Sequence, residues 1–204
     1  MEKQYFDEKA EQWDTPFRIE RAAILADAVR AQLKPTDRKA LDFGCGTGLL
    51  ALNLLKNLPD LSVTDHSEEM ISVLQRKLEQ NGTALDIIPT ENLGEDCYFG
   101  RFDLVYSSMV FHHIRKVEDE MLKLRRLIVK GGRFLMIDLN PVDPEFHADF
   151  PEFDGHHGFS REEIAKHFTR CGFTDLMVTD CFESSRLVNG KEIPYSLFLA
   201  IGTK

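Results

Sequence analysis

A short apolar stretch that runs directly into closely spaced glycines constrains this chain more than any other feature. Residues 39–43 form the stretch, and Gly44, Gly46 and Gly48 follow it at alternate positions. Glycine reaches backbone angles that other residues avoid, and it has no side chain to keep a ligand away from the main chain. The pattern therefore predicts a strand that turns tightly into a helix, with bare backbone where a ligand can lie.

The spacing of the glycines and of two nearby acids indicates the kind of ligand. Dinucleotide sites carry a third glycine where this chain has Leu49, and a pyrophosphate prefers amide donors to a carboxylate such as Asp42. An acid at this position suits a cationic ligand. Asp65 ends the next apolar stretch, where its carboxylate can accept both hydrogen bonds of a ribose diol. The alternative is a purely structural turn with Asp42 as a buried cap, and the second acid argues against it.

The pattern Asp42-x-Gly44-x-Gly46-x-Gly48 followed by Asp65 resembles the cofactor site of class I S-adenosylmethionine-dependent methyltransferases of the small-molecule type. Residues 102–107 resemble the fourth-strand motif of that family, and residues 130–135 resemble its turn into the fifth strand. The resemblance extends from about Tyr5 to the C-terminus. It implies an α/β, Rossmann-like, doubly wound sheet of seven strands, mostly parallel with the last strand antiparallel. It also implies S-adenosyl-L-methionine as cofactor and S-adenosyl-L-homocysteine as product.

The resemblance also assigns residues to the cofactor. It places the amides near Gly44 and Gly46 against the methionine part, the carboxylate of Asp65 on the ribose, and the segment 91–93 at the adenine edge. A frequent aspartate of the family is replaced here by Pro89 or Thr90, which leaves the partner of the adenine amino group open. The predicted cofactor-binding residues are Trp13, Asp42, Gly44, Cys45, Gly46, Asp65, His66, Met70, Glu91, Asn92, Leu93 and Ser107.

Two segments rich in aromatic residues are predicted to enclose the acceptor of the methyl group. Residues 5–13 resemble the lid of small-molecule methyltransferases, and residues 140–159 form a connection long enough to be a functional loop. The predicted acceptor-binding residues are Tyr5, Phe6, Phe146, His147, His156 and His157, and the candidate general bases are His112 and His113. The loop histidines with Asp149 and Asp154 are an alternative metal site, but no strict ligand spacing supports it, and no metal is predicted.

The order of apolar patterns predicts helices and strands that alternate along the chain. Thr15 caps a helix that begins at Pro16 and stops before Pro35, and Ser160 with Glu163 has the spacing of a capping box. Strands are predicted at 39–43, 61–64, 85–88, 102–107 and 133–139, followed by 176–182 and 195–201 joined near Asn189-Gly190. This alternation indicates a parallel sheet covered by helices on both faces.

Length and charge complete the prediction. The 204 residues suit one domain, 1–204, with a lid and first helix at 1–34 and an acceptor-side loop at 140–159. No apolar stretch approaches the roughly 20 residues that cross a bilayer, the beginning of the chain lacks the pattern of a signal peptide, and a cytoplasmic protein with reduced cysteines is expected. A net charge of −9 disfavours nucleic acid as a partner. The oligomeric state stays open.

These observations favour an enzyme that methylates an O, N or S atom of a small organic acceptor. A non-catalytic protein that binds S-adenosylmethionine, such as a regulator or adaptor, would carry the same nucleoside site. A nicotinamide-dependent oxidoreductase is disfavoured by Leu49.

Overall fold

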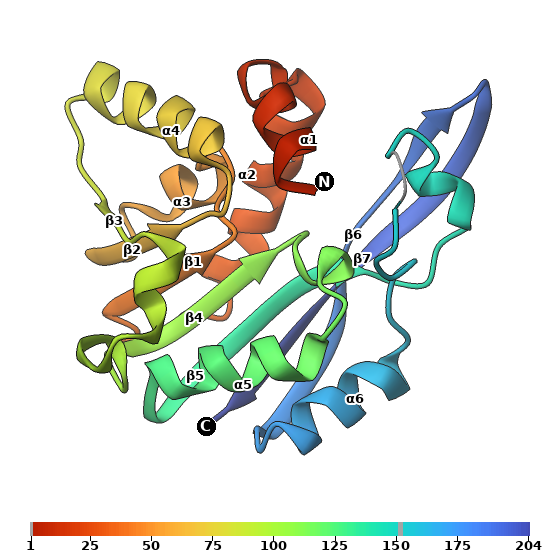
Figure 1. Cartoon of the computed structure of the whole chain (residues 1–204). Coiled ribbons are helices and arrows are strands. Elements are labelled where there is room, and N and C mark those ends of the chain that lie inside the picture. Colours follow the sequence, from red (N-terminus) through yellow and green to blue (C-terminus); the bar gives the residue numbers. More distant parts are fainter. Residues whose placement is uncertain (1, 151–152) are drawn as a thin grey trace.

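The computed structural model describes residues 2–150 and 153–204, and within them the chain forms one seven-stranded sheet with helices on both faces (Figure 1). The strands are β1 (Lys39–Phe43), β2 (Asp60–Thr64), β3 (Asp86–Ile87), β4 (Phe102–Ser108), β5 (Ile128–Leu139), β6 (Thr174–Val188) and β7 (Lys191–Thr203). The α-helices are α1 (Glu2–Lys9), α2 (Pro16–Arg30), α3 (Leu49–Leu54), α4 (Glu68–Asn81), α5 (Val117–Leu127) and α6 (Arg161–Arg170). Short 3-10 helices are η1 (Ala10–Gln12), η2 (Thr90–Gly94), η3 (Asp96–Tyr98), η4 (Phe111–His113) and η5 (Pro144–His147).

The strand order is β3-β2-β1-β4-β5-β7-β6, and it confirms the predicted topology. The pairs β1–β2, β1–β4, β2–β3 and β4–β5 are parallel, whereas β7 runs antiparallel to both β5 and β6. The strands β2 and β3 lie on one side of β1, and β4 lies on its other side, so the strand order reverses between β1 and β4. Ligands of such sheets bind beyond the carboxyl ends of the strands at this switch point, so the fold places the glycine loop after β1 at the expected position.

Alternate residues of the central strands pack against helices on opposite faces. Ala40 of β1 belongs to the apolar cluster that includes residues of α2, α3 and α4, and its neighbour Leu41 belongs to the cluster that includes residues of α5 and α6. In Figure 1, α2, α3 and α4 accordingly lie on one side of the sheet and α5 and α6 on the other. Both faces of the strands are thus buried, which explains why they read as apolar runs rather than as an alternating pattern.

Local signals place several ends of elements where the sequence predicts them. The hydroxyl of Thr15 accepts a hydrogen bond from the Arg18 amide at the start of α2, and Ser160 and Glu163 form a full capping box at the start of α6. Asn189 and Gly190 both have positive φ, as a two-residue hairpin turn requires. The hairpin itself is longer than predicted, because β6 and β7 extend six residues beyond 182 and four residues before 195 to reach that turn.

Among the described residues, none of the helices has the length and hydrophobicity needed to cross a lipid bilayer.

Candidate active site

The glycine loop between β1 and α3 requires glycine for its backbone and, at two positions, for its packing. Gly44, Gly46 and Gly48 have φ of 76°, 54° and 78°, which are angles that residues with a Cβ rarely adopt. A Cβ would lie 2.3 Å from Val110 if placed on Gly44, and 2.4 Å from Leu74 if placed on Gly48. On Gly46 it would meet only the indole nitrogen of Trp13, at 3.8 Å, so the main chain at this glycine remains open.

A cavity of about 440 Å³ adjoins this loop and is called the cofactor cavity below. It lies at the carboxyl ends of β1, β2 and β4, and its size suits a nucleoside ligand. Its lining includes eight of the twelve residues that the sequence assigns to the cofactor: Trp13, Asp42, Gly44, Cys45, Gly46, Asp65, His66 and Met70.

The other four predicted cofactor residues lie outside this lining. Ser107 points into the core and donates a hydrogen bond of 2.8 Å to the Phe43 carbonyl, while its neighbour Ser108 lines the cavity. The reason is the alternation of side chains along a strand, by which a shift of one residue reverses the face. Thr90 likewise lines the cavity in place of Glu91, Asn92 and Leu93, because the turn of η2 buries Leu93 in the α5-side core.

Asp42 is the strongest electrostatic feature of the cofactor cavity. Its side chain is 1% exposed, and its Oδ2 atom has no hydrogen-bond partner within residues 2–150 and 153–204. Burial raises the pKa of the Asp42 carboxyl to about 8, opposed by the nearby Tyr106 hydroxyl and reinforced by the charge of Asp65. An ionised carboxylate in this place is costly unless a cation faces it. The residues present therefore fit a positively charged cofactor.

Asp65 shapes the glycine loop from the end of β2. One carboxylate oxygen accepts the Gly46 amide at 2.7 Å, and the other accepts the Ser67 amide at 2.8 Å. Burial raises the pKa of Asp65, while these amide donors oppose the rise. Each oxygen retains acceptor capacity, so the predicted ribose contact is compatible with this geometry and stays a prediction.

A second cavity, of about 410 Å³, adjoins the first and is called the acceptor cavity below. The predicted acceptor residues Tyr5, Phe6, Phe146 and His147 line it. Six residues line both cavities and so form a shared wall: Phe6, Trp13, Arg18, Arg21, Met109 and His113.

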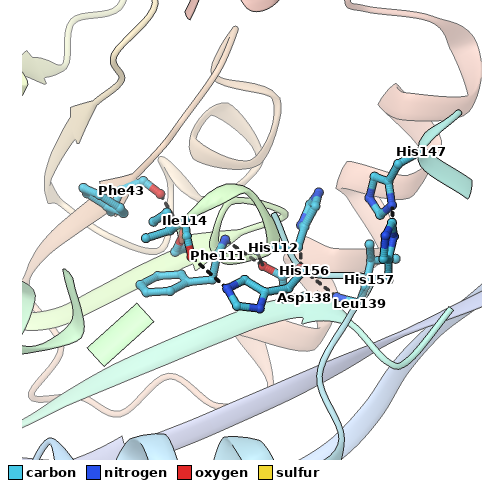
Figure 2. A network of polar contacts seen from close by, with 10 residues as sticks. Phe43, Phe111, His112, Ile114, Asp138, Leu139, His147, His156 and His157 are labelled. Atoms are coloured by element: carbon cyan, nitrogen blue, oxygen red, sulfur yellow. Dashed lines mark hydrogen bonds and ion pairs between the residues drawn. The ribbon is translucent and has the colours of Figure 1, made fainter. Parts of the chain in front are cut away.

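His156 and His157 do not line the acceptor cavity, contrary to the sequence prediction. The His156 amide donates to the His112 carbonyl, and its Nε2 atom lies 3.1 Å from the Ile114 carbonyl oxygen (Figure 2). The Nδ1 atoms of His157 and His147 lie 3.1 Å apart. Both side chains are thus engaged in contacts within the protein, next to Gly158, where the loop packs so closely that a Cβ would lie 2.1 Å from the Asn140 carbonyl oxygen.

His112 has the geometry of an oriented base. Its Nδ1 atom lies 2.6 Å from Oδ1 of Asp138 (Figure 2), and its ring lines the acceptor cavity. Asp138 is fully buried and also accepts the Phe111 and Leu139 amides, each at 2.8 Å. Burial alone would raise the pKa of Asp138, but the charge and hydrogen bond of His112 and the Leu139 amide hold it below its ordinary value. An ionised Asp138 fixes the proton of His112 on Nδ1 and leaves Nε2 as the acceptor.

The neighbouring histidines differ from His112 in their environment. His113 lines both cavities and packs against the rings of Phe6 and Phe150 at centroid distances of 5.2 and 5.3 Å. Burial, together with the neighbouring histidines, lowers the pKa of His147 to about 3, and its ring stacks on Phe153 at 3.9 Å. His147 is therefore neutral at physiological pH and too weak a base to accept a proton there.

The acids of the alternative metal site are engaged in ion pairs. Asp149 pairs with Arg186 at 2.8 Å, and Asp154 pairs with Arg115. In the part of the chain that the structure describes, no cluster of three or more His, Cys, Asp or Glu side chains has an arrangement that could hold a metal ion.

The N-terminal segment docks on α4 through polar contacts. The Lys3 ammonium lies 2.7 Å from Glu68, and the Ser67 hydroxyl donates to Asp7 at 2.6 Å. Further along, Asp14 pairs with Lys77 and accepts a hydrogen bond of 2.6 Å from the hydroxyl of Thr47 in the glycine loop. Glu11 also pairs with Arg76. These contacts hold the segment that carries Phe6 and Trp13, two residues of the shared wall, in place beside the two cavities.

Comparison with known proteins identifies the family. Residues 17–178 match the model of a family described as a methyltransferase domain. The chain belongs to that family. This confirms the resemblance to class I S-adenosylmethionine-dependent methyltransferases that the glycine motif indicates.

Relatives of this chain are similar to it over part of their length. An uncharacterized methyltransferase of Schizosaccharomyces pombe is 26% identical over 168 residues, covering 78% of this chain and 57% of the relative. The demethylmenaquinone methyltransferase of Thermus thermophilus is 28% identical over 116 residues, covering 56% of this chain and 53% of the relative. The chain thus spans just over half the length of these two proteins. A solved methyltransferase structure from Thermotoga maritima, 16% identical, superposes with a TM-score of 0.70 over 98% of both chains and shows the same fold.

Sequence reasoning missed several residues that the fold brings to the two cavities. Asp138 is the single acid in the apolar run 134–139, and an acid within a buried strand could have indicated a functional residue. Arg18 and Arg21 are three residues apart on α2 and so share one helix face, which was a second signal. Arg186 lies on β6, far along the chain from α2, and no local sequence pattern predicts that it lines the acceptor cavity.

Proposed function

We propose that this methyltransferase transfers the methyl group of S-adenosyl-L-methionine to an O, N or S atom of a small organic acceptor. One observation carries the proposal. The cofactor cavity has a buried carboxylate, one oxygen of which has no hydrogen-bond partner among the described residues, beside open glycine backbone. It shares a wall with a second cavity that contains an oriented histidine. The first suits a cationic nucleoside cofactor, and the second suits a molecule that must give up a proton as it is methylated.

The cofactor supplies a sulfonium-bound methyl group that is already reactive toward nucleophiles. Asp42 and Asp65 provide negative charge at the glycine loop, and the rings of Phe6 and Trp13 provide aromatic faces that attract a cation. The same rings reduce the access of water to the region where the two cavities meet. Placement of donor and acceptor in line can lower the barrier by on the order of 7–11 kcal/mol, which exceeds what a general base contributes.

His112 is the residue best placed to accept the proton of the acceptor. The acceptor's O, N or S atom would form its bond to the methyl carbon as the bond from that carbon to sulfur breaks, with the electron pair of the broken bond staying on sulfur. The acceptor's proton would pass to Nε2 of His112, and Asp138 would stabilise the resulting imidazolium. After the products leave, the imidazolium returns the proton to water. General-base catalysis of this kind contributes roughly 10²- to 10⁴-fold. His113 is the second candidate, since it lines the shared wall.

Size and charge support a small molecule rather than a nucleic acid as acceptor. The acceptor cavity has a volume of about 410 Å³ and lies behind the N-terminal segment. The chain carries a net charge of −9, which disfavours binding to a polyanion.

The proposal is tested with purified protein, methyl-labelled S-adenosylmethionine and fractionated small-molecule extracts. Calorimetry should show binding of S-adenosylhomocysteine, and label should appear in a small-molecule fraction. Tight cofactor binding with no transfer to any fraction would indicate a non-catalytic regulator or adaptor instead.

The active fraction then tests the base. His112→Gln and Asp138→Asn should each lower kcat by at least tenfold while changing cofactor affinity less than twofold, because both residues act on the acceptor proton. His167→Gln is the matched control, since His167 pairs with Glu118 away from both cavities. An unchanged kcat in the His112→Gln protein would remove this residue from the mechanism.

A further inference from the structure

We propose that the acceptor carries an anionic oxygen group, a carboxylate or a phosphate, which binds to an arginine cluster in the acceptor cavity. The cluster consists of Arg18, Arg21 and Arg186. This inference rests on the proposed function and adds to it the chemical class of the substrate.

The charged side chains that line the acceptor cavity in the described part of the chain are all arginines. Among residues 2–150 and 153–204, its lining contains these three arginines and no Asp or Glu side chain, although the chain as a whole has 34 acidic and 25 basic residues. The cofactor cavity differs, because Asp42 and Asp65 lie at its glycine loop. A cationic ligand is therefore favoured at the loop and an anionic one in the neighbouring cavity.

Arg18 is held in place by Trp13. Its guanidinium stacks over the Trp13 ring at 3.9 Å and donates to the Trp13 carbonyl at 3.1 Å. Burial lowers the pKa of Arg18, and the positive charges of Arg21 and Arg186 lower it further. The three guanidinium groups thus repel one another, and a bound anion would relieve this repulsion.

Arg21 and Arg186 are oriented by different contacts. Arg21 lies 3.5 Å from the Tyr195 hydroxyl, and within residues 2–150 and 153–204 neither it nor Arg18 forms an ion pair. Arg186 donates to the Phe146 carbonyl at 2.7 Å and pairs with the half-exposed Asp149 at 2.8 Å. Guanidinium groups fixed in this way bind carboxylates and phosphates with little loss of side-chain freedom.

The cofactor also has a carboxylate, on its methionine part, so two sources of an anion must be separated. Arg18 and Arg21 line both cavities, whereas Arg186 lines the acceptor cavity alone. Because Arg186 belongs to the arginine cluster and lines only the acceptor cavity, the acceptor is favoured as the source of the bound anion. The rings of Tyr5, Phe6, Phe146 and Phe150 line the same cavity, and they suit an aromatic or otherwise apolar body attached to the anionic group.

The test uses calorimetric titration of the protein saturated with S-adenosylhomocysteine. Benzoate and phenyl phosphate are the anionic probes, and benzamide and benzylamine are the neutral and cationic probes of similar shape. We expect at least one anionic probe to bind tenfold or more tightly than both others. Arg21→Gln and Arg186→Gln should each weaken that binding about 10- to 100-fold. Arg38→Gln, which removes an exposed arginine outside both cavities, should not. Arg186→Lys serves if the Gln variant does not fold.

A second ligand distinguishes the acceptor's anion from the cofactor's. 5′-Methylthioadenosine has the nucleoside and sulfur of the cofactor without the amino acid. If the arginine substitutions weaken S-adenosylhomocysteine but leave 5′-methylthioadenosine and the anionic probes unchanged, the cluster serves the cofactor and the inference is overturned. Equal or tighter binding of benzamide or benzylamine, or no binding of any probe, also overturns it. Failure of the unmodified protein to bind S-adenosylhomocysteine would instead contradict the proposed function.

Discussion

Asp42 should link cofactor binding to pH, in a direction that follows from its raised pKa. Its pKa of about 8 in the folded protein lies above the ordinary value of 3.8. The stability that Asp42 contributes is therefore fully present below pH 3.8 and is lost as pH rises through about 8. Affinity for a cation has the opposite dependence, because only the ionised carboxylate attracts it. Cofactor affinity should rise with pH and level off near pH 8.

The magnitude follows from the same pKa. At pH 7 the protonated carboxyl outnumbers the ionised form about tenfold, so deprotonation costs about 1.4 kcal/mol before a cation can bind. Between pH 6 and pH 7 this cost falls by nearly the same amount. The Kd for S-adenosylmethionine should thus fall about tenfold over that unit of pH, with release of close to one proton for each molecule bound.

Calorimetry in two buffers with different heats of ionisation measures both the affinity and the released protons. The Asp42→Asn protein should bind S-adenosylmethionine more weakly and without this pH dependence. Any contribution from the amino group of the ligand is the same in both proteins, so their difference isolates Asp42. 5′-Methylthioadenosine, which is uncharged, should bind both proteins with little dependence on pH.

A flat Kd between pH 6 and pH 7 in the unmodified protein, with no proton released, would refute the reasoning. It would mean either that Asp42 is already ionised in the free protein or that it does not face the charge of the ligand.

Two further substitutions test the N-terminal segment and the acceptor-side loop. Asp14→Asn removes the half-buried ion pair with Lys77 and should weaken cofactor binding by about 1 kcal/mol, or roughly fivefold by calorimetry, and an unchanged Kd would show that the pair does not hold the segment closed. Gly158→Ala combines a φ of 85° with a Cβ that would lie 2.1 Å from the Asn140 carbonyl oxygen, so chemical denaturation should show a loss of about 3 kcal/mol or more. Gly100→Ala, with positive φ but open space around it, should lose only about 1–2 kcal/mol, and equal losses would contradict the close approach at Gly158.

Local patterns in the sequence predict the fold and most of the residues that line the cofactor cavity among those they assign to it. The glycine spacing, the Thr15 cap and the Asn189-Gly190 turn each depend on neighbouring residues, and the structure has all three where they are expected. Ser107 shows the limit of such patterns, because a choice between adjacent strand residues depends on which face the sheet presents to the cavity.

The acceptor end depends on contacts between distant segments, and sequence patterns describe it less well. His156 turns away from the cavity because its amide and ring bond to residues of the η4 region. Arg186 meets Arg18 and Arg21 only because the β6–β7 hairpin reaches α2. Asp138 was visible as an isolated acid, but its pairing with His112 requires the alignment of β5 with the end of β4.

The position of Phe6 and Trp13 in the wall of both cavities has a kinetic consequence. A displacement of the N-terminal segment that released the nucleoside product would also uncover the acceptor cavity, because Phe6 and Trp13 line both cavities. Exchange of the cofactor and exchange of the acceptor would then share one opening rate, and a new molecule of each would enter during the same opening. If separation of the ionic contacts with α4 limits turnover, the rate at saturating substrate should rise with added salt, and a rate that does not change would show that another step is limiting.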